Sequence, residues 1–173
     1  MEKKKIDWSN LGFGYVQTDA RYVSNFRDGA WDEGGLTSDA NITMNECACV
    51  LQYAQTVFEG MKAYTTAGGQ TVCFRPDLNA QRMMDSCRRM RMPVFPKERF
   101  LDAIRQTVQA NRAWVPPYGS GASLYLRPYM FGYDAVIGVK PASEFQFRVF
   151  GTPVGPYFKG GVRPLTVRIS DLD

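Results

Sequence analysis

Histidine is absent from this chain of 173 residues. Without an imidazole the chain has no Ser-His-Asp or Cys-His catalytic group, and it lacks the most common metal-ligating side chain. The 4 cysteines, Cys47, Cys49, Cys73 and Cys87, form no CxxC motif, and Cys47 and Cys49 without further ligands are weak evidence for a metal. We therefore expect no metal site, and four reduced, mostly packed cysteines as in a cytoplasmic protein.

Long apolar runs are missing as well. The basic residues at positions 3–5 are not followed by an apolar stretch, and no segment approaches the length that crosses a membrane. The glycine-rich pieces match neither G-x-G-x-x-G nor a P-loop. The net charge of +4 is spread along the sequence, without a basic stripe interleaved with aromatic residues. These absences argue against a membrane or a nucleic acid as partner.

The composition indicates one ordinary domain. The chain is 45% hydrophobic and 13% aromatic, which is enough apolar material for a substantial core. Two prolines and three glycines within residues 152–163 are typical of a connection between domains, and the alternation at 165–169 predicts a new strand. We expect a domain over residues 1–151, a connection over 152–163, and the first strand of a further domain over 164–173.

The periodicity of apolar residues predicts a mixture of strands and helices that is not a strict alternation of the two. The expected strands cover residues 11–31 with a turn at Asp28-Gly29, 61–66 and 71–75 with a turn at Gly68-Gly69, 122–131, and 144–150, and the expected helices cover 46–58, 77–92 and 97–112. This order favours an α+β fold, with a mostly antiparallel sheet and two or three helices on one face. A doubly wound parallel sheet is the alternative.

The sequence GASLYLRP at residues 121–128 places a phenol beside a guanidinium. Alternate residues of a strand share a face, so we expect Ser123, Tyr125 and Arg127 on one side of the sheet. The planar fork of an arginine binds a carboxylate through two hydrogen bonds, and a tyrosine adds direction. The alternative is a surface arginine on a half-exposed sheet. We expect Pro128 to end the strand and leave Arg127 near an edge.

Arg75 is a second candidate anion-binding residue. It follows a predicted strand, directly before Pro76 and a predicted helix, and we expect Phe74 to point into the core and Arg75 to the opposite face. A permanently charged guanidinium at this position suits a phosphate. The spacing fits equally well a structural ion pair with Asp77 or Asp85.

Tyr53 and Phe58 lie five residues apart, which separates them by roughly 140° on one continuous helix. They are therefore expected to face different parts of the core rather than one pocket wall. Lys62 is expected at the start of a strand with its ammonium group in solvent, rather than as a catalytic amine.

Several blocks of sequence carry a family resemblance. They are Tyr53, then VFEGMKAY at 57–64, FRPDLNAQRM at 74–83, SCRRMRMP at 86–93, RAWVPPYGSGASLYLRP at 112–128, IGVKPASE at 137–144, and TPVGPYFKGG at 152–161. Together they resemble the branched-chain amino acid aminotransferases from Phe13 onward, most weakly over residues 25–46. This family has the fold type IV of pyridoxal phosphate (PLP) enzymes, so residues 1–151 are expected to be its small N-terminal domain.

The resemblance implies roles for eight residues. Arg75 would bind the PLP phosphate. The other residues would contact the substrate: Phe13, Phe58, Tyr125, Arg127 and Tyr157 in the site of their own subunit, and Tyr53 and Val139 in the site of the second subunit of a homodimer. The lysine that holds PLP as a Schiff base in this family would lie beyond Asp173, so we expect no catalytic lysine in this chain and little activity from residues 1–173 alone.

Three functions agree with these observations. The first is the transfer of an amino group from leucine, isoleucine or valine to 2-oxoglutarate, which gives glutamate and a branched 2-oxo acid. The second is a non-catalytic module for dimerisation or regulation. The third is another fold type IV enzyme, a D-amino acid aminotransferase or an aminodeoxychorismate lyase, whose sequences resemble this chain less in the FEGMKAY, FRP and SLYLRP blocks.

Overall fold

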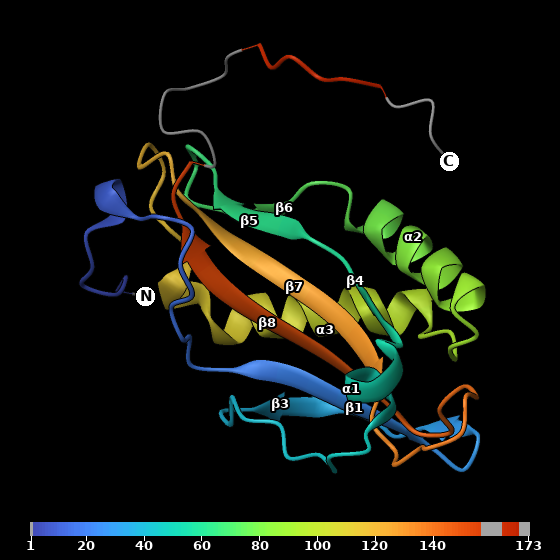
Figure 1. Cartoon of the computed structure of the whole chain (residues 1–173). Helices are drawn as coiled ribbons and strands as arrows, with labels where there is room; N and C mark the ends of the chain where they lie inside the picture. The colour runs from blue at the N-terminus through green and yellow to red at the C-terminus, as the bar shows by residue number, and fades with distance from the viewer. Residues whose placement is uncertain (1, 157–163, 170–173) are drawn as a thin grey trace.

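A computed structural model describes residues 2–156 and 164–169 of the chain. They form an α+β domain built on an 8-stranded sheet (Figure 1). The strand order is β2-β1-β8-β7-β5-β6, with β3 paired to β1 and β4 paired to β7, and every pairing is antiparallel. The expected antiparallel α+β fold is confirmed.

The elements have the following bounds. The strands are β1 (Arg21–Arg27), β2 (Ala30–Trp31), β3 (Gly35–Thr37), β4 (Thr56–Phe58), β5 (Met61–Thr65), β6 (Thr71–Cys73), β7 (Ser123–Gly132) and β8 (Phe145–Val154). The helices are α1 (Cys49–Tyr53), α2 (Pro76–Arg89) and α3 (Lys97–Ala110), with short 3-10 turns η1 (Trp8–Asn10) and η2 (Arg112–Trp114).

Both predicted hairpin turns are present. Asp28 and Gly29 have φ angles of 51° and 78°, and they join β1 to β2 in a two-residue loop of the kind that matches the twist of antiparallel strands. In the β5-β6 hairpin Gly69 has φ of 76°, and the amide of Thr66 donates to the carbonyl of Gln70 at 2.8 Å. Glycine is needed at position 69 because other residues adopt that backbone rarely.

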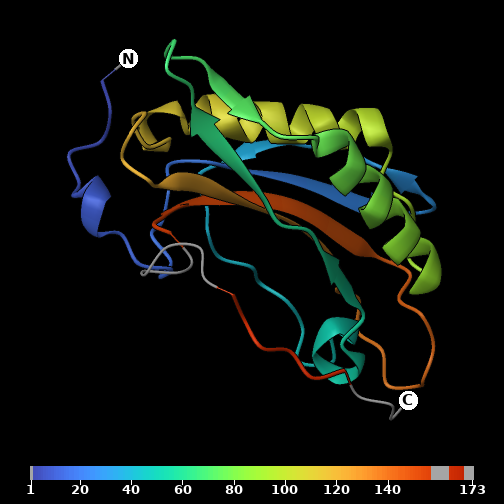
Figure 2. The same ribbon diagram turned by 90° about the horizontal axis from the view of Figure 1, so that it is seen from above.

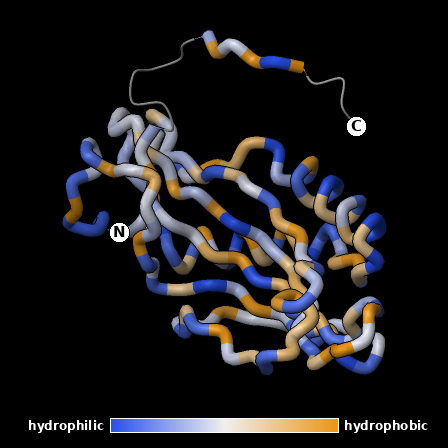
Figure 3. Tube along the Cα trace, in the orientation of Figure 1, coloured by the Kyte–Doolittle hydropathy of each residue, from blue (hydrophilic) through white to orange (hydrophobic). Residues whose placement is uncertain are grey.

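Helices α2 and α3 lie together on one face of the sheet (Figure 2). Apolar and polar residues alternate along both helices (Figure 3), so each buries one side and exposes the other. Helix α3 packs on β1 and β8, and α2 packs on α3 and β4. The core between the layers is aromatic, with the rings of Phe95 and Phe147 stacked 3.9 Å apart and Phe100 beside them.

The helix predicted over residues 46–58 is much shorter in the structure. Helix α1 ends at Tyr53, the next residue Ala54 has a left-handed φ of 51°, and β4 begins at Thr56. The apolar residues at 46–58 fit a helix, but β7 offers a backbone ladder from Phe131 to Tyr129, and β-branched and aromatic residues suit that pairing. Phe58 is therefore on a strand, and the rotation of roughly 140° expected from Tyr53 does not apply.

Pro128 does not end its strand, in contrast to the prediction. Strand β7 continues to Gly132, and β8 pairs with it along its whole length. The neighbour on the other side of β7 is interrupted between Phe58 and Met61, where β4 ends and β5 begins. The Pro128 carbonyl accepts a hydrogen bond from the amide of Glu59 at 2.8 Å on that side, so the missing proline N–H falls at an interruption rather than in a continuous ladder.

Two other boundaries differ from expectation. The first strand begins at Arg21, and residues before it run beside β8, with the Val16 amide donating to Thr152 Oγ1 at 2.8 Å. Strand β8 extends to Val154, so the predicted connection starts inside a strand. Residues 157–163 lie outside the described residues, and 165–169 form no strand in the structure. The division into domains stays a prediction.

Candidate functional site

The two faces of β7 differ in chemistry. Leu124 and Leu126 are fully buried against the helices, whereas Tyr125 and Arg127 are half-buried on the opposite side of the sheet, which we call the open face. The predicted common side for Tyr125 and Arg127 is confirmed. Their position in a ten-residue central strand gives them a rigid backbone, which is suited to holding a ligand in a fixed orientation.

Arg127 is held by aromatic groups rather than by an acid. Its Nε donates to the Tyr125 hydroxyl at 3.0 Å, and its guanidinium lies 4.4 Å above the ring of Phe58 and 5.3 Å from the ring of Tyr125. No carboxylate pairs with Arg127 in the part of the chain that the structure describes. Cation–π contacts orient a guanidinium without neutralising it, so Arg127 keeps charge and N–H donors for an anion.

A hollow of about 270 Å³, here the Tyr125 hollow, lies beside this cluster. Its lining comes from β5, β7, the start of α2 and the residues directly before β5 and after β6: Gly60, Met61, Lys62, Tyr64, Phe74, Asn79 and Tyr125. The ring of Phe13 lies 5.8 Å from that of Tyr125, and a Cβ built on Gly60 would lie 2.6 Å from the Tyr125 hydroxyl. Gly60 therefore permits the observed position of Tyr125.

Lys62 lies in β5 directly opposite Tyr125 and borders the Tyr125 hollow. The expected location at the beginning of a strand is confirmed, and the side chain is half-buried rather than fully in solvent.

Arg75 forms one of the two structural pairs that the sequence left open. Its Nε and Nη2 donate to the two carboxylate oxygens of Asp77, each at 2.9 Å, while Asp85 pairs with Arg88. The hydrogen bonds from Arg75 lower the pKa of Asp77 to about 2. Arg75 has a left-handed φ of 45° immediately before α2, and its side chain is about half exposed.

Phe74 is 83% exposed, so the prediction that it points into the core was wrong. It is followed by the turn into α2 rather than by further strand, and it borders the Tyr125 hollow. Arg127 is linked to the Tyr125 hollow through its hydrogen bond to Tyr125. A role for Arg75 in phosphate binding remains a prediction.

The segments that carry Tyr53 and Val139 come together at another corner of the domain. The hydroxyl of Tyr53 donates to the carbonyl of Ile137, and Ala48 forms a bridge with Ala135. Val139 is 90% exposed and Tyr53 is 38% exposed. Tyr53 therefore contacts the segment that carries Val139, two residues from its partner Ile137. Tyr157, the remaining predicted contact residue, lies outside the described residues.

Three residues with a clear part in the open face were not singled out by the sequence. Gly60 carries no local signal of this kind, because its closeness to Tyr125 depends on the fold. Arg21 and Arg148 are both buried on the open face and border one pocket. Alternation along β1 and β8 was the available signal for the two arginines, but it cannot show that two distant strands are adjacent.

Metal and membrane signatures are absent from the described residues. Over 2–156 and 164–169 no group of three acidic or cysteine side chains could hold a metal ion. None of the helices found in these ranges combines the length and the apolar character that a bilayer crossing requires. The four cysteines are free thiols, and burial raises the pKa of Cys87 to about 12.

Comparison with known proteins was made by sequence and by structure. No family model matches the chain. A branched-chain-amino-acid aminotransferase of Haemophilus influenzae is 48% identical over 170 residues, covering 98% of this chain and 50% of the relative. The chain is a homologue of the branched-chain aminotransferases. The Helicobacter pylori protein of that name is 47% identical over 159 residues, covering 92% of this chain and 47% of the relative.

The chain thus spans about half the length of the curated relatives it matches. Two structures of the branched-chain amino acid aminotransferase of Escherichia coli superpose with TM-scores of 0.64 and 0.60, at 24% and 25% identity. They cover 81% and 78% of this chain, and each match spans 41% of the solved chain. The structural likeness confirms the fold, and the sequence relatives carry the family resemblance.

Proposed function

We propose that this chain provides the small, substrate-binding domain of a PLP-dependent branched-chain aminotransferase. The observation that carries the proposal is the cluster of Arg127, Tyr125 and Phe58, an arginine without a carboxylate partner held over aromatic rings on the open face. It occurs in a chain 48% identical to a protein named as such an enzyme. The reaction transfers the amino group of leucine, isoleucine or valine to 2-oxoglutarate.

Arg127 and Tyr125 would bind the second carboxylate of glutamate or 2-oxoglutarate. A guanidinium that is already oriented by Phe58 and by the Tyr125 hydroxyl loses little freedom when it binds an anion. Phe13 and Phe58, with Tyr157 by resemblance, would form the apolar wall for a branched side chain. An apolar wall discriminates by only about 1–3 kcal/mol per methylene, so one site accommodates all three branched substrates.

The residues present fit the phosphate of PLP. Arg75 is exposed at the N-terminus of α2, a helix of 14 residues, where backbone N–H groups and the helix dipole also favour an anion. The guanidinium of Arg75 forms an ion pair with Asp77 in the structure. A phosphate would bind to Arg75 either beside Asp77 or in its place. PLP supplies the electron sink of transamination when it is bound. No lysine of this chain is assigned to the cofactor.

A homodimer is part of the proposal. Tyr53 is hydrogen-bonded to Ile137, two residues from the exposed Val139, which supports the expectation that both Tyr53 and Val139 contact a second subunit. We also propose a cytoplasmic location, supported by the four free cysteines, which suit a reducing compartment.

A chimera tests the proposed function. The half of the Haemophilus influenzae relative that aligns with this chain is replaced by residues 1–173, and transamination is measured with leucine, isoleucine, valine and D-alanine. We expect activity on the three branched L-amino acids with 2-oxoglutarate as acceptor. Arg127→Leu in the chimera should raise KM for 2-oxoglutarate by about tenfold or more, since a charged hydrogen bond is lost.

Two outcomes contradict the proposal. A chimera that is folded by circular dichroism and binds PLP, yet has no turnover, would remove the enzymatic role and leave the non-catalytic module. A preference for D-alanine would assign the chain to another enzyme of the same fold.

A further inference from the structure

A second pocket on the open face contains two buried arginines. It has a volume of about 360 Å³ and lies across β1, β8 and β7, with further lining from the segment before β1 and the segment after β3. Its polar lining consists of two guanidinium groups, two phenols and two amides: Arg21, Arg148, Tyr15, Tyr129, Gln17 and Asn41. None of these residues takes part in the function proposed above.

Arg21 and Arg148 are only 3% and 6% exposed, and neither forms an ion pair among residues 2–156 and 164–169. Their hydrogen bonds go to neutral oxygens. Arg21 donates to the carbonyls of Ser38 and Thr18, and Arg148 donates to Gln146 Oε1 at 2.8 Å and to the Asp39 carbonyl at 3.2 Å.

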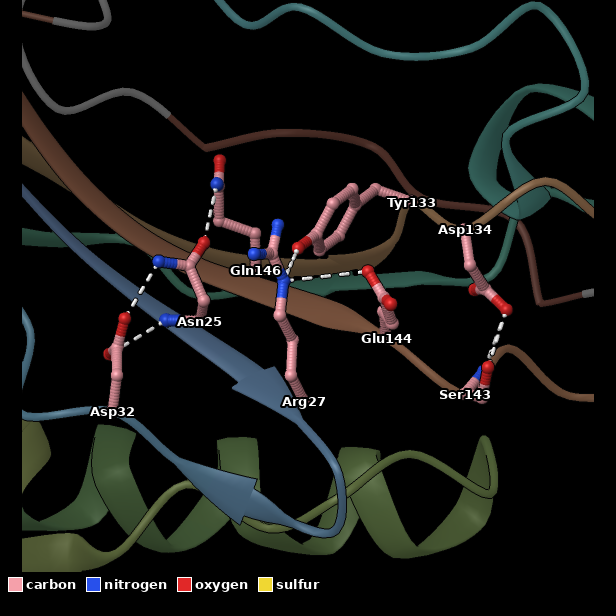
Figure 4. A network of polar contacts seen from close by, with 8 residues as sticks. All are labelled: Asn25, Arg27, Asp32, Tyr133, Asp134, Ser143, Glu144 and Gln146. Carbon is pink, nitrogen blue, oxygen red and sulfur yellow. Dashed lines mark hydrogen bonds and ion pairs between the residues drawn. The ribbon is translucent and has the colours of Figure 1, made fainter.

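Arg27 lies on the same face of β1 as Arg21 but differs from it in burial and in its partners. It is more than half exposed, lies 3.5 Å from the carboxylate of Glu144 and bonds to Tyr133 (Figure 4). The exposed arginine therefore has a carboxylate within ion-pair distance, whereas neither buried arginine has one among the described residues. The nearby carboxylate of Asp39 interacts electrostatically with both Arg148 and Arg21, but it forms no ion pair with either, and its Oδ1 accepts a hydrogen bond from the Asn41 amide at 2.9 Å.

Burying two like charges in one pocket is unfavourable. Burial lowers the pKa of Arg148, and the charge of Arg21 lowers it further. The hydroxyls of Tyr15 and Tyr129 accept and donate no hydrogen bond within the described part of the chain, so they remain available to a ligand. A buried cation normally has an anionic partner, and two guanidinium groups match the oxygens of a carboxylate or phosphate.

We propose that Arg21 and Arg148 form a binding site for a small oxyanion, a carboxylate or a phosphate, with the hydroxyl of Tyr129 as a further donor. The ligand places its oxygens between the two guanidinium groups and offsets both charges. The volume of the pocket also accepts a short dicarboxylate. The inference does not rest on the proposed aminotransferase function, since it uses neither Arg75 nor Arg127.

The test is anion binding to the chain of 173 residues. Inorganic phosphate and glutarate are titrated separately by calorimetry, and thermal unfolding is followed with each anion against sodium chloride of equal ionic strength. We expect saturable binding, and a higher Tm with the bound anion than with chloride. Arg148→Gln should weaken the binding about tenfold or more, since a charged hydrogen-bond donor is lost.

Two further variants make the result specific. Tyr129→Phe removes only a hydroxyl and should weaken anion binding about fivefold. This variant replaces Arg148→Gln in the test if Arg148→Gln does not fold. Arg27→Gln removes one charge from the same face and should leave the affinity unchanged. The anion that binds with the higher affinity shows whether the natural ligand is a phosphate or a carboxylate. The proposal is overturned if the wild-type chain binds neither anion, which is the result expected when an acidic side chain of another polypeptide occupies the pocket. It is also overturned if Arg148→Gln and Tyr129→Phe bind the anion as tightly as wild type does.

Discussion

At the residue scale, the surroundings of each arginine decide what it can do. Arg75 has a carboxylate partner at 2.9 Å, Arg127 lies over aromatic rings, and Arg21 and Arg148 are buried with neutral partners. The side-chain chemistry is the same in all four. The charge of an arginine without an acidic neighbour is not offset within the chain, which is why Arg127 is the stronger candidate for a substrate carboxylate, whereas a phosphate at Arg75 has to compete with Asp77.

The Arg75 and Asp77 pair gives a prediction for pH. Asp77 should titrate at about 2 in NMR of the folded chain, and Arg75→Gln should move the midpoint up toward the ordinary 3.8 because the hydrogen bonds from the guanidinium are lost. The folded-state pKa is below the unfolded value. The stabilising contribution of the pair is therefore complete above about 3.8 and lost as the pH falls through about 2.

Asp102 is the internal control for this titration. Its pKa is also lowered, through Gln106 and Arg105, and Arg75→Gln should leave it unchanged. A wild-type Asp77 midpoint near 3.8 would show that the pair is not formed in solution.

Gly60→Ala tests the close packing against Tyr125. The new Cβ would lie 2.6 Å from the Tyr125 hydroxyl, so the ring must move and the bond to Arg127 is disturbed. We expect a loss of about 1–3 kcal/mol in the free energy of unfolding, measured with urea. In Gly68→Ala the nearest atom, Thr66 Oγ1, is 3.9 Å away, so this control should be neutral or stabilise by up to about 1 kcal/mol. Equal effects of the two substitutions would contradict the packing argument.

At the element scale, Glu59 joins the strand layer to α2. Its carboxylate is 2% exposed and accepts from Arg82 Nε and Nη2 at 2.7 and 2.6 Å and from Asn79 Nδ2 at 2.8 Å. Glu59 stands between Phe58 and Gly60, so the contacts of its side chain with α2 hold the interruption between β4 and β5 in place. The interruption in turn positions Phe58 under Arg127 and Gly60 beside Tyr125.

Arg82→Ala should therefore destabilise the fold through Glu59. The buried carboxylate keeps only Asn79, and we expect a loss of about 1–3 kcal/mol in the free energy of unfolding. Arg82 is itself 69% exposed, so solvent screening places the value toward the lower end. Arg88→Ala, on the same helix, breaks a pair whose two side chains are 54% and 59% exposed, and should cost about 0–1 kcal/mol. A smaller loss for Arg82→Ala than for Arg88→Ala would exclude the proposed link.

The elements also show where sequence prediction worked. Helices α2 and α3 were predicted within three residues of their bounds, because their apolar stripes and the prolines around them are local signals. The prediction of one helix over residues 46–58 was wrong because an apolar run of that length fits a helix or a buried strand equally well. Residues 56–58 form strand β4 because the distant strand β7 offers them a hydrogen-bonding edge.

At the scale of the whole molecule, the sheet separates two kinds of chemistry. The face under α2 and α3 holds the aromatic core, whereas the open face carries Arg127, Arg148 and Arg21 on the adjacent strands β7, β8 and β1. Strand β1 is far from the other two in the chain, and it joins them because β8 lies between β1 and β7 in the sheet. The pairing of β1 with β8 thus builds the Arg21 and Arg148 pocket from residues 127 positions apart.

The sequence by itself determined the alternation that puts Tyr125 and Arg127 on one side of a strand, the hairpin turns and the family resemblance, since each depends on neighbouring residues or on sequence identity. The tertiary structure alone decided that Phe58 lies under Arg127, that Gly60 gives room to Tyr125, and that Arg21 meets Arg148. The physical reason is that strand pairing joins segments whose separation in the chain leaves no local signal, and burial of charge becomes visible only after that pairing.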